Sequence, residues 1–282
     1  MARARRRLDR GYALLAVLWI SVGIGGLAVL ISEAASGAIA SSRNRIALAA
    51  AGWLAAGCVA RARVAVADAL QHEIIEHADL MLKSWDRVDQ LLRAEPLPAG
   101  CTLAARPVGA RLDLNASDGS TLGRLFRNIG MKPPRADSAA SAVAAHKPYV
   151  DLRQLHLLPG LESVGVLDSV LDVEPGPIAL NQAPASVLAL LPGFTDETVQ
   201  RVLEARARGE PIASFQALSE LLSPDDPGAS ARLPAAAVFQ PVAWVITARA
   251  MAGRPAVTSV VEVRLGRAGS GTSIGPQKSW VE

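Results

Sequence analysis

An uncharged apolar run of twenty residues, from Tyr12 to Ile31, stands near the start of this sequence. A helix of that length spans about 30 Å at roughly 1.5 Å per residue, which is enough to cross the hydrocarbon core of a bilayer. Five arginines and one aspartate precede it in residues 1–10. This excess of positive charge predicts that the N-terminal end stays in the cytoplasm and that the bulk of the chain lies across the membrane. The anchor residues predicted in residues 12–31 are Leu14, Leu15, Val17, Leu18, Trp19, Ile20, Leu27 and Leu30.

The position of a single glycine argues against a conventional secretory signal peptide. Such a peptide has an apolar region of about 7 to 15 residues, followed by a cleavage site with small residues. Here Gly11 lies before the apolar run, directly after the arginine cluster. The sequence therefore predicts that the apolar helix is retained as an anchor.

The order of arginines, Gly11 and apolar run resembles the class III signal of type IV pilins and type II secretion pseudopilins. The resemblance implies that a prepilin peptidase cuts after Gly11, removes residues 1–11, and leaves Tyr12 as an N-methylated terminus. Most members of the family carry a glutamate four residues after the new terminus, where this chain has Ala16. An ordinary signal anchor is the alternative interpretation of this junction.

Loss of that glutamate resembles the K-type minor pseudopilins, which are thought to lie at the tip of the pseudopilus. An unpaired carboxylate inside a membrane costs several kcal/mol, and a subunit with nothing above it has no neighbour to pair with. Ala16 is therefore the replacement expected of a tip subunit.

Proline is absent from residue 34 to residue 93, and apolar residues recur there near helical spacing. We expect one long helix over residues 12–93, with its first part in the membrane and its second part against a head. Pro96 and Pro98 end it. Cys58 lies in this stretch and Cys101 follows it. In an oxidising compartment the two can form a disulfide, but Cys58 fits equally well as a small buried apolar residue, and the sequence leaves both readings open.

Two parts of the chain predict a small antiparallel sheet. A short alternating stretch around Leu112 precedes a turn and a short helix that ends at Gly130. Residues 242–251 and 257–265 predict a β-hairpin with its turn at residues 252–255. We assign residues 94–130 and 231–282 to a head packed on the long helix, and expect a mobile tail after the hairpin apart from one last strand.

The segment between these parts predicts an inserted all-helical domain over residues 131–230. It contains ALNQAPASVLALLPGF (179–194) and SFQALSELL (214–222), and an earlier DLRQLHLLPGL (151–161) echoes the first. Residues 131–143 are predicted to be a loop. These motifs resemble the SAM-like, or helix-hairpin-helix, insert of K-type pseudopilins. The predicted fold class is α+β, with a pilin-like N-terminal helix on a small antiparallel sheet and this helical insert.

Helix-hairpin-helix units also bind DNA, so a minor pilin of a type IV pilus or competence system is the alternative function. The nucleic-acid version presents backbone amides and basic side chains to phosphate. Here the hairpin of residues 192–197 has one glycine and ends in two acids. The three arginines that follow, Arg201, Arg206 and Arg208, are balanced by Glu197, Glu204 and Glu210. A solvated helix face, without nucleic acid, is the favoured interpretation.

The sequence contains no recognisable catalytic or metal-binding constellation, so we expect a non-enzymatic protein without a cofactor. Asp225 and Asp226 are weak candidates for calcium, and a polar turn is the simpler account of them. The resemblance implies a minor pseudopilin that forms or initiates the pseudopilus tip and so serves export of folded proteins across the outer membrane. It implies as partners the I, J and H types of minor pseudopilin, the major pseudopilin and the prepilin peptidase. It places the anchor in the inner membrane and the globular part in the periplasm.

Overall fold

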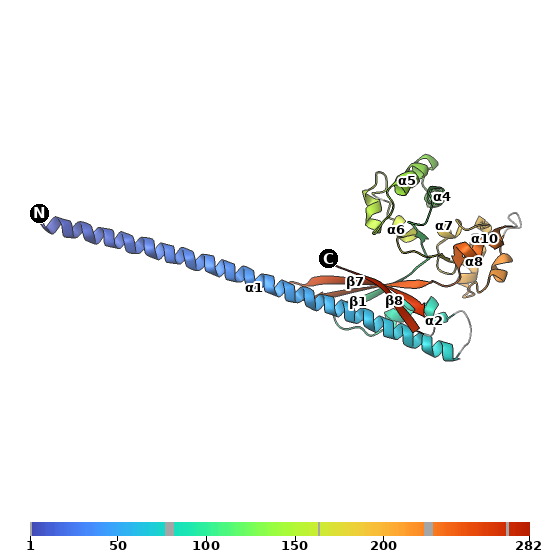
Figure 1. Cartoon of the computed structure of the whole chain (residues 1–282), viewed down its shortest axis with the longest axis horizontal. Helices are drawn as coiled ribbons and strands as arrows, with labels where there is room; N and C mark the ends of the chain where they lie inside the picture. Colours follow the sequence, from blue (N-terminus) through green and yellow to red (C-terminus); the bar gives the residue numbers. More distant parts are fainter. Residues whose placement is uncertain (1, 77–81, 163, 223–227, 269–270) are drawn as a thin grey trace.

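The computed structural model describes residues 2–76, 82–162, 164–222, 228–268 and 271–282. It consists of a very long N-terminal helix, a four-stranded sheet beside the C-terminal part of that helix, and a helical insert at the end of the molecule remote from the N-terminus (Figure 1). The α+β class is therefore confirmed. The N-terminal half of the long helix therefore extends away from the folded head.

Helix α1 (Ala2–Glu76) has 75 residues, which corresponds to about 110 Å at 1.5 Å per residue. The prediction of one helix reaching residue 93 was wrong, because α2 (Lys83–Asp86) and α3 (Val88–Ala94) are separate short helices. Leu82 before α2 is extended, with φ −81° and ψ 113°. The Glu73 carboxylate accepts hydrogen bonds from the backbone N–H groups of Lys83 and Ser84, so α1 itself caps the start of the next helix.

The sheet contains β1 (Cys101–Pro107), β6 (Ala243–Ala252), β7 (Val257–Ala268) and β8 (Gly271–Val281), in the order β1-β6-β7-β8. All neighbouring pairs are antiparallel, and the β6–β7 hairpin is confirmed. The expected last strand is present as β8, whose Val281 pairs with Ser259 of β7, but it takes up most of the tail that was predicted to be mobile. Pairing along β7 supplies the order that its glycine- and serine-rich sequence does not indicate.

The strand predicted near Leu112 does not belong to this sheet. Leu112–Asp113 forms β2, which pairs in parallel with β3 (Leu171–Asp172), and β1 takes its place beside β6. The physical reason is burial: Leu112 and Leu114 lie in the apolar core of the insert. Their alternation was correctly taken as a buried strand but assigned to the wrong sheet.

The insert begins earlier than residue 131, since α4 (Gly119–Asn128) shares its core. The supposed loop at residues 131–143 is the start of helix α5 (Pro133–Ala145). Its two prolines occupy the first turn, where their missing N–H groups cost nothing, and alanines follow. The chain returns to the head after Phe239, which also packs against this core. The boundaries at 131 and 230 therefore shift to about 112 and 239.

The remaining elements of the insert are short. They are η1 (Leu152–Leu157), α6 (Leu167–Val170), β4 (Ile178–Ala179), α7 (Ala185–Leu188), α8 (Asp196–Ala207), α9 (Phe215–Ser219), α10 (Ala229–Ala236) and β5 (Ala237–Val238). The two similar LPG segments both turn at a glycine with positive φ, +84° at Gly160 and +74° at Gly193. The repeated motif thus folds into two equivalent turns.

Candidate functional site

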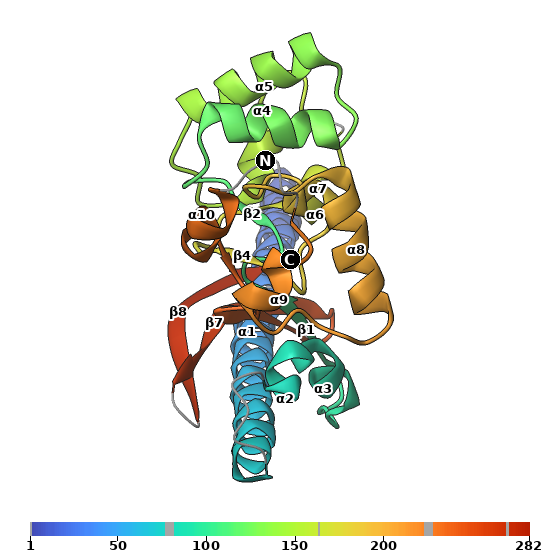
Figure 2. The same ribbon diagram turned by 90° about the vertical axis from the view of Figure 1, so that its right-hand side faces the viewer.

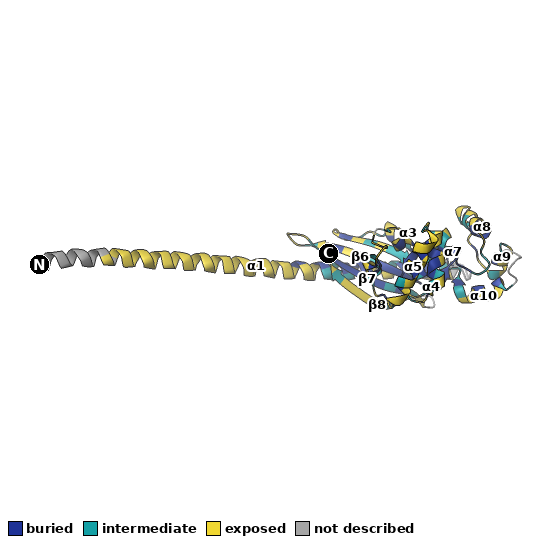
Figure 3. Ribbon diagram, turned by 90° about the horizontal axis from the view of Figure 1, so that it is seen from above, coloured by how far each residue is buried: buried dark blue, intermediate teal, exposed yellow. Residues whose placement is uncertain are grey.

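The N-terminal half of α1 carries apolar side chains with nothing packed on them. Every described side chain from residue 14 to residue 46 is exposed, and the first buried one is Ala47. Figure 3 shows this half as an exposed rod that leaves the head behind. Exposed fractions reach 74% at Leu14 and 69% at Trp19. Apolar surface of this extent is unfavourable in water, and one such helix is long and apolar enough to cross a membrane.

The predicted anchor residues all lie on this exposed rod: Leu14, Leu15, Val17, Leu18, Trp19, Ile20, Leu27 and Leu30. Tyr12 is 72% exposed and Ala16 is exposed beside it, and the helix runs without interruption through Gly11. The Ser21 hydroxyl donates to the Val17 carbonyl at 2.9 Å, so its polar group is satisfied within the helix. The rod therefore presents an almost wholly apolar surface from Leu14 to Ile31, and polar and charged side chains follow from Ser32 to Arg45.

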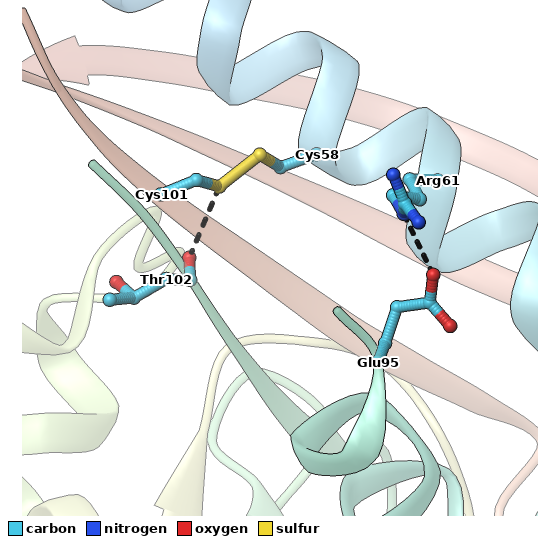
Figure 4. Close-up of a disulfide and its surroundings, with 5 residues drawn as sticks. All are labelled: Cys58, Arg61, Glu95, Cys101 and Thr102. Carbon is cyan, nitrogen blue, oxygen red and sulfur yellow. Dashed lines mark hydrogen bonds and ion pairs between the residues drawn. A yellow bond between two sulfur atoms is a disulfide. The ribbon is translucent and has the colours of Figure 1, made fainter. Parts of the chain in front are cut away.

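A disulfide joins α1 to the sheet. Cys58 on α1 and Cys101 at the start of β1 are bonded, with a Cα–Cα distance of 6.8 Å. Figure 4 shows that the bond runs from the helix to the strand, with the Arg61–Glu95 ion pair at 2.7 Å beside it. Cys58 is wholly buried. The choice that the sequence left open is resolved: Cys58 is a buried residue and also a partner in a cross-link.

Two tryptophans lock the short helices to the sheet. The Trp85 indole Nε1 donates to the Pro241 carbonyl at 2.6 Å, and the Trp244 indole Nε1 donates to the Trp85 carbonyl at 2.9 Å. Both side chains are buried, so each polar N–H has a partner where water cannot supply one. The Gln240 side chain adds two hydrogen bonds to the backbone of Leu82. The segment after α1 is thereby held against the head.

Charged residues fix the base of the insert on the sheet. Asp172 is buried and forms an ion pair with Arg106 of β1, and burial lowers the pKa of that guanidinium. Glu174 contacts Arg264 at 3.3 Å and Lys278 at 3.0 Å, on β7 and β8. Burial opposes ionisation of Glu174, but these two bonds outweigh it and lower its pKa. The insert is therefore tied to three strands by complementary charge.

One asparagine closes the insert on itself. The Asn181 side chain accepts from the Ile212 backbone N–H at 2.9 Å and donates to the carbonyls of Ile212 and Phe239. Its amide bridges segments that lie 31 and 58 residues away. The Asn181 side chain therefore links three segments that are distant in the sequence.

The α8 arginines are occupied within the chain. Arg201 pairs with Glu197 at 2.5 Å and Arg208 with Glu210 at 3.0 Å. Arg206 donates to the Ala183 carbonyl at 2.6 Å, and burial lowers its pKa to about 10. The first turn of α8 carries Asp196 and Glu197. This helix offers a mixed surface rather than a basic one.

Asp118 gives the insert a specific sensitivity to acid. It caps α4 by accepting from the Thr121 N–H at 2.7 Å, and this bond, aided by the Thr121 and Ser120 side chains, lowers its pKa to about 2. A depressed carboxyl pKa stabilises the fold above the ordinary value of 3.8, and this contribution is lost as pH falls through about 2. We therefore expect Asp118→Asn, which can still cap the helix, to remove part of the pH dependence of unfolding between about pH 4 and 2. Circular dichroism across that range measures it, and an unchanged dependence contradicts the assignment.

Calcium ligation is not tested by the structure. Asp225 and Asp226 lie outside the described residues. Within the part of the chain that the structure describes, no group of three or more His, Cys, Asp or Glu side chains is arranged to hold a metal ion. Calcium at that turn stays a weak prediction.

Comparison with solved structures identifies a protein with a similar fold. No known family profile matches the sequence, and no curated protein matches it. A chain in the crystal structure of the GspK-GspI-GspJ complex from the type 2 secretion system of enterotoxigenic Escherichia coli superposes with a TM-score of 0.61 at 15% sequence identity. The match covers 85% of this chain and 99% of that chain. This protein shares its fold with a subunit of that complex.

Sequence reasoning missed the contacts that hold the short helices and the insert on the sheet. The Trp85–Trp244 and Arg106–Asp172 pairs join residues far apart in the chain. A lone tryptophan or arginine in the sequence carries no sign of its distant partner. The even number of cysteines was the one available signal, and it permitted the disulfide without requiring it.

Proposed function

We propose that this chain is a minor pseudopilin of a type II secretion system, of the K type. The observation that carries the proposal is an exposed apolar helix continuous with a head whose fold is shared with a subunit of the GspK-GspI-GspJ complex. The helix anchors the protein in the inner membrane, the arginine-rich end stays in the cytoplasm, and the head lies in the periplasm. The protein works as a structural subunit without a catalytic site or cofactor.

The insert suits a subunit at the end of a fibre. It lies at the end of the molecule remote from the N-terminus (Figure 1), where a further subunit would otherwise stack. Ala16 replaces the glutamate that other subunits use to pair with a neighbour in the membrane. We propose that the chain forms or initiates the pseudopilus tip together with minor pseudopilins of the I, J and H types, above the major pseudopilin.

A DNA-binding role in a type IV pilus or competence system has less support. The α8 arginines are engaged by Glu197, Glu210 and the Ala183 carbonyl, and phosphate binding would have to break those contacts. A gel shift at physiological salt with the detergent-solubilised protein tests it. Retardation of DNA at micromolar protein would favour the alternative.

Maturation at Gly11 is the most direct test of the proposal. From cells containing the prepilin peptidase we expect a protein that begins at N-methylated Tyr12, and from cells lacking the enzyme the unprocessed chain. Replacing Gly11 by leucine is expected to abolish processing. Gly23→Ala is the matched control, because a Cβ at Gly23 meets open space on the same helix. N-terminal sequencing and intact mass measure both, and any other terminus in wild-type cells would refute the pseudopilin assignment.

A further inference from the structure

The insert and the sheet are two bodies with separate apolar cores. Helix α1 shares one core with the sheet, and the insert has a core of its own. A small cluster of Val108, Ala243 and Val245 lies where the chain passes from one body to the other. Figure 1 and Figure 2 show α4 and α5 on one side of the sheet and α1 on the opposite side. The insert therefore faces the side of the sheet that is remote from α1.

A cleft of about 390 Å³ separates part of the insert from this side of the sheet. Val261 and Val263 of β7 belong to the core shared with α1, so Glu262 between them points to the other face. The insert lines the cleft with residues 150–153 and 172–173. The sheet side is lined by Arg106, Arg249, Glu262, Lys278, Trp280 and Glu282. The two bodies thus meet across charged walls with space between them.

The insert is held at the base of the cleft and is free at its opening. At the base, Asp172 pairs with Arg106, and Glu174 pairs with Lys278 at 3.0 Å. Within the described residues, no hydrogen bond or ion pair joins residues 150–153 to the sheet. The base therefore provides a pivot about which the other wall can tip.

The charges on the two walls are complementary but do not touch. Asp151 and Arg153 lie on the insert side, opposite Lys278 and Glu282. Hydrogen bonding to Arg153 lowers the pKa of Asp151, and Lys278 adds to this effect through space. The bond to Asp151 raises the pKa of Arg153, and Glu282 adds to that effect. Neither cross-cleft pair forms an ion-pair contact in the described part of the chain.

The present partners of these charges are easily exchanged. Arg153 pairs with Asp151 at 2.6 Å and Glu282 pairs with Arg249 at 3.4 Å, each on its own side of the cleft. The Arg153 side chain is 79% exposed and that of Glu282 is 43% exposed. Exposed ion pairs contribute little to stability, so replacing them by pairs across the cleft costs little. Val150, which also lines the cleft, is 70% exposed and would gain cover if the walls met.

We propose that the insert is a lid that tips about its base and closes on the open face of the sheet. In the closed arrangement Asp151 meets Lys278 and Arg153 meets Glu282, and water leaves the cleft. The attraction acts across the gap before contact, so salt weakens it: the Debye length falls from about 30 Å at 0.01 M to about 3 Å at 1 M. Low salt therefore favours the closed lid. This motion belongs to the single chain and does not depend on the proposed function.

Electron spin resonance distances on the full chain in detergent follow the lid. Spin labels are attached at Leu157→Cys and Met251→Cys, whose native side chains are 81% and 56% exposed and lie outside the cleft. The native cysteines are bonded to each other and do not take up label. We expect a shorter distance component that grows about threefold when salt falls from about 1 M to about 0.01 M. A control pair at Met251→Cys and Gln277→Cys, both on the sheet, should keep one distance. A distance between the insert and the sheet that does not respond to salt would overturn the proposal.

Charge exchange identifies the groups responsible. Arg153→Glu and Glu282→Arg, each alone, are expected to reduce the shorter component about threefold at low salt, because each places like charges across the cleft. The variant that carries both should recover the component to within about twofold of wild type. Arg208→Glu makes the same charge change on the insert, outside the cleft, and should have no effect. With all variants folded by circular dichroism, failure of the double variant to recover, or an equal loss with Arg208→Glu, would refute the lid.

Discussion

Replacing Trp244 by alanine is expected to destabilise the head by about 3–5 kcal/mol, the usual range for removal of a buried tryptophan. Trp244 is 1% exposed and lies in the core between α1 and the sheet. The substitution leaves a cavity and also removes the donor to the Trp85 carbonyl. The short helices after α1 are then held by one indole fewer. Urea unfolding of the detergent-solubilised protein, followed by circular dichroism, measures the loss.

Trp53 provides a control of the same residue type on the same molecule. It is 81% exposed, so Trp53→Ala is expected to change the free energy of unfolding by no more than about 0.5 kcal/mol. Equal destabilisation by the two substitutions would contradict the burial of Trp244 in the core between α1 and the sheet.

Loss of the Cys58–Cys101 disulfide is expected to cost about 4 kcal/mol, because the bond closes a long loop in the unfolded chain. The two cysteines are 43 residues apart in the sequence. Alanine at both positions removes the cross-link and keeps small apolar side chains in a buried site. Urea unfolding measures the difference from oxidised wild type.

Reduction of the wild-type protein is the matching experiment. Dithiothreitol should lower its free energy of unfolding by a similar amount, and the double alanine variant should show no response to the reagent. A wild-type protein whose stability is the same with and without reductant would mean that the bond is absent from the native protein.

Local sequence patterns were enough for the elements that stabilise themselves. The β6–β7 hairpin followed from alternation on both sides of a Gly-containing turn. The exposed apolar stretch of α1 could be predicted equally well, because its side chains have no distant partner within the described part of the chain. Such features depend on neighbouring residues, so the local sequence is sufficient to predict them.

Features that depend on distant contacts escaped sequence reasoning. Helix α2 is held apart from α1 by the Glu73 carboxylate, which caps it, and by the Trp85 indole, which donates to the Pro241 carbonyl 156 residues away. Leu112 was assigned to the wrong sheet because the sequence of so short a strand does not show which strand lies beside it. Leu112 pairs with Leu171, and Cys101 of β1 is the residue that pairs with Ala250 of β6. Helix α5 was missed because its prolines suggested a loop, although the first turn of a helix tolerates them.

The cross-link between Cys58 and Cys101 has a mechanical consequence. A mechanical load applied to the exposed half of α1 reaches the folded head through that helix, which packs on β6 and β7 through apolar contacts. A covalent bond to β1 transmits that load directly into a strand hydrogen-bonded along its length to β6. A pull on α1 therefore reaches the sheet through a covalent bond as well as through apolar packing.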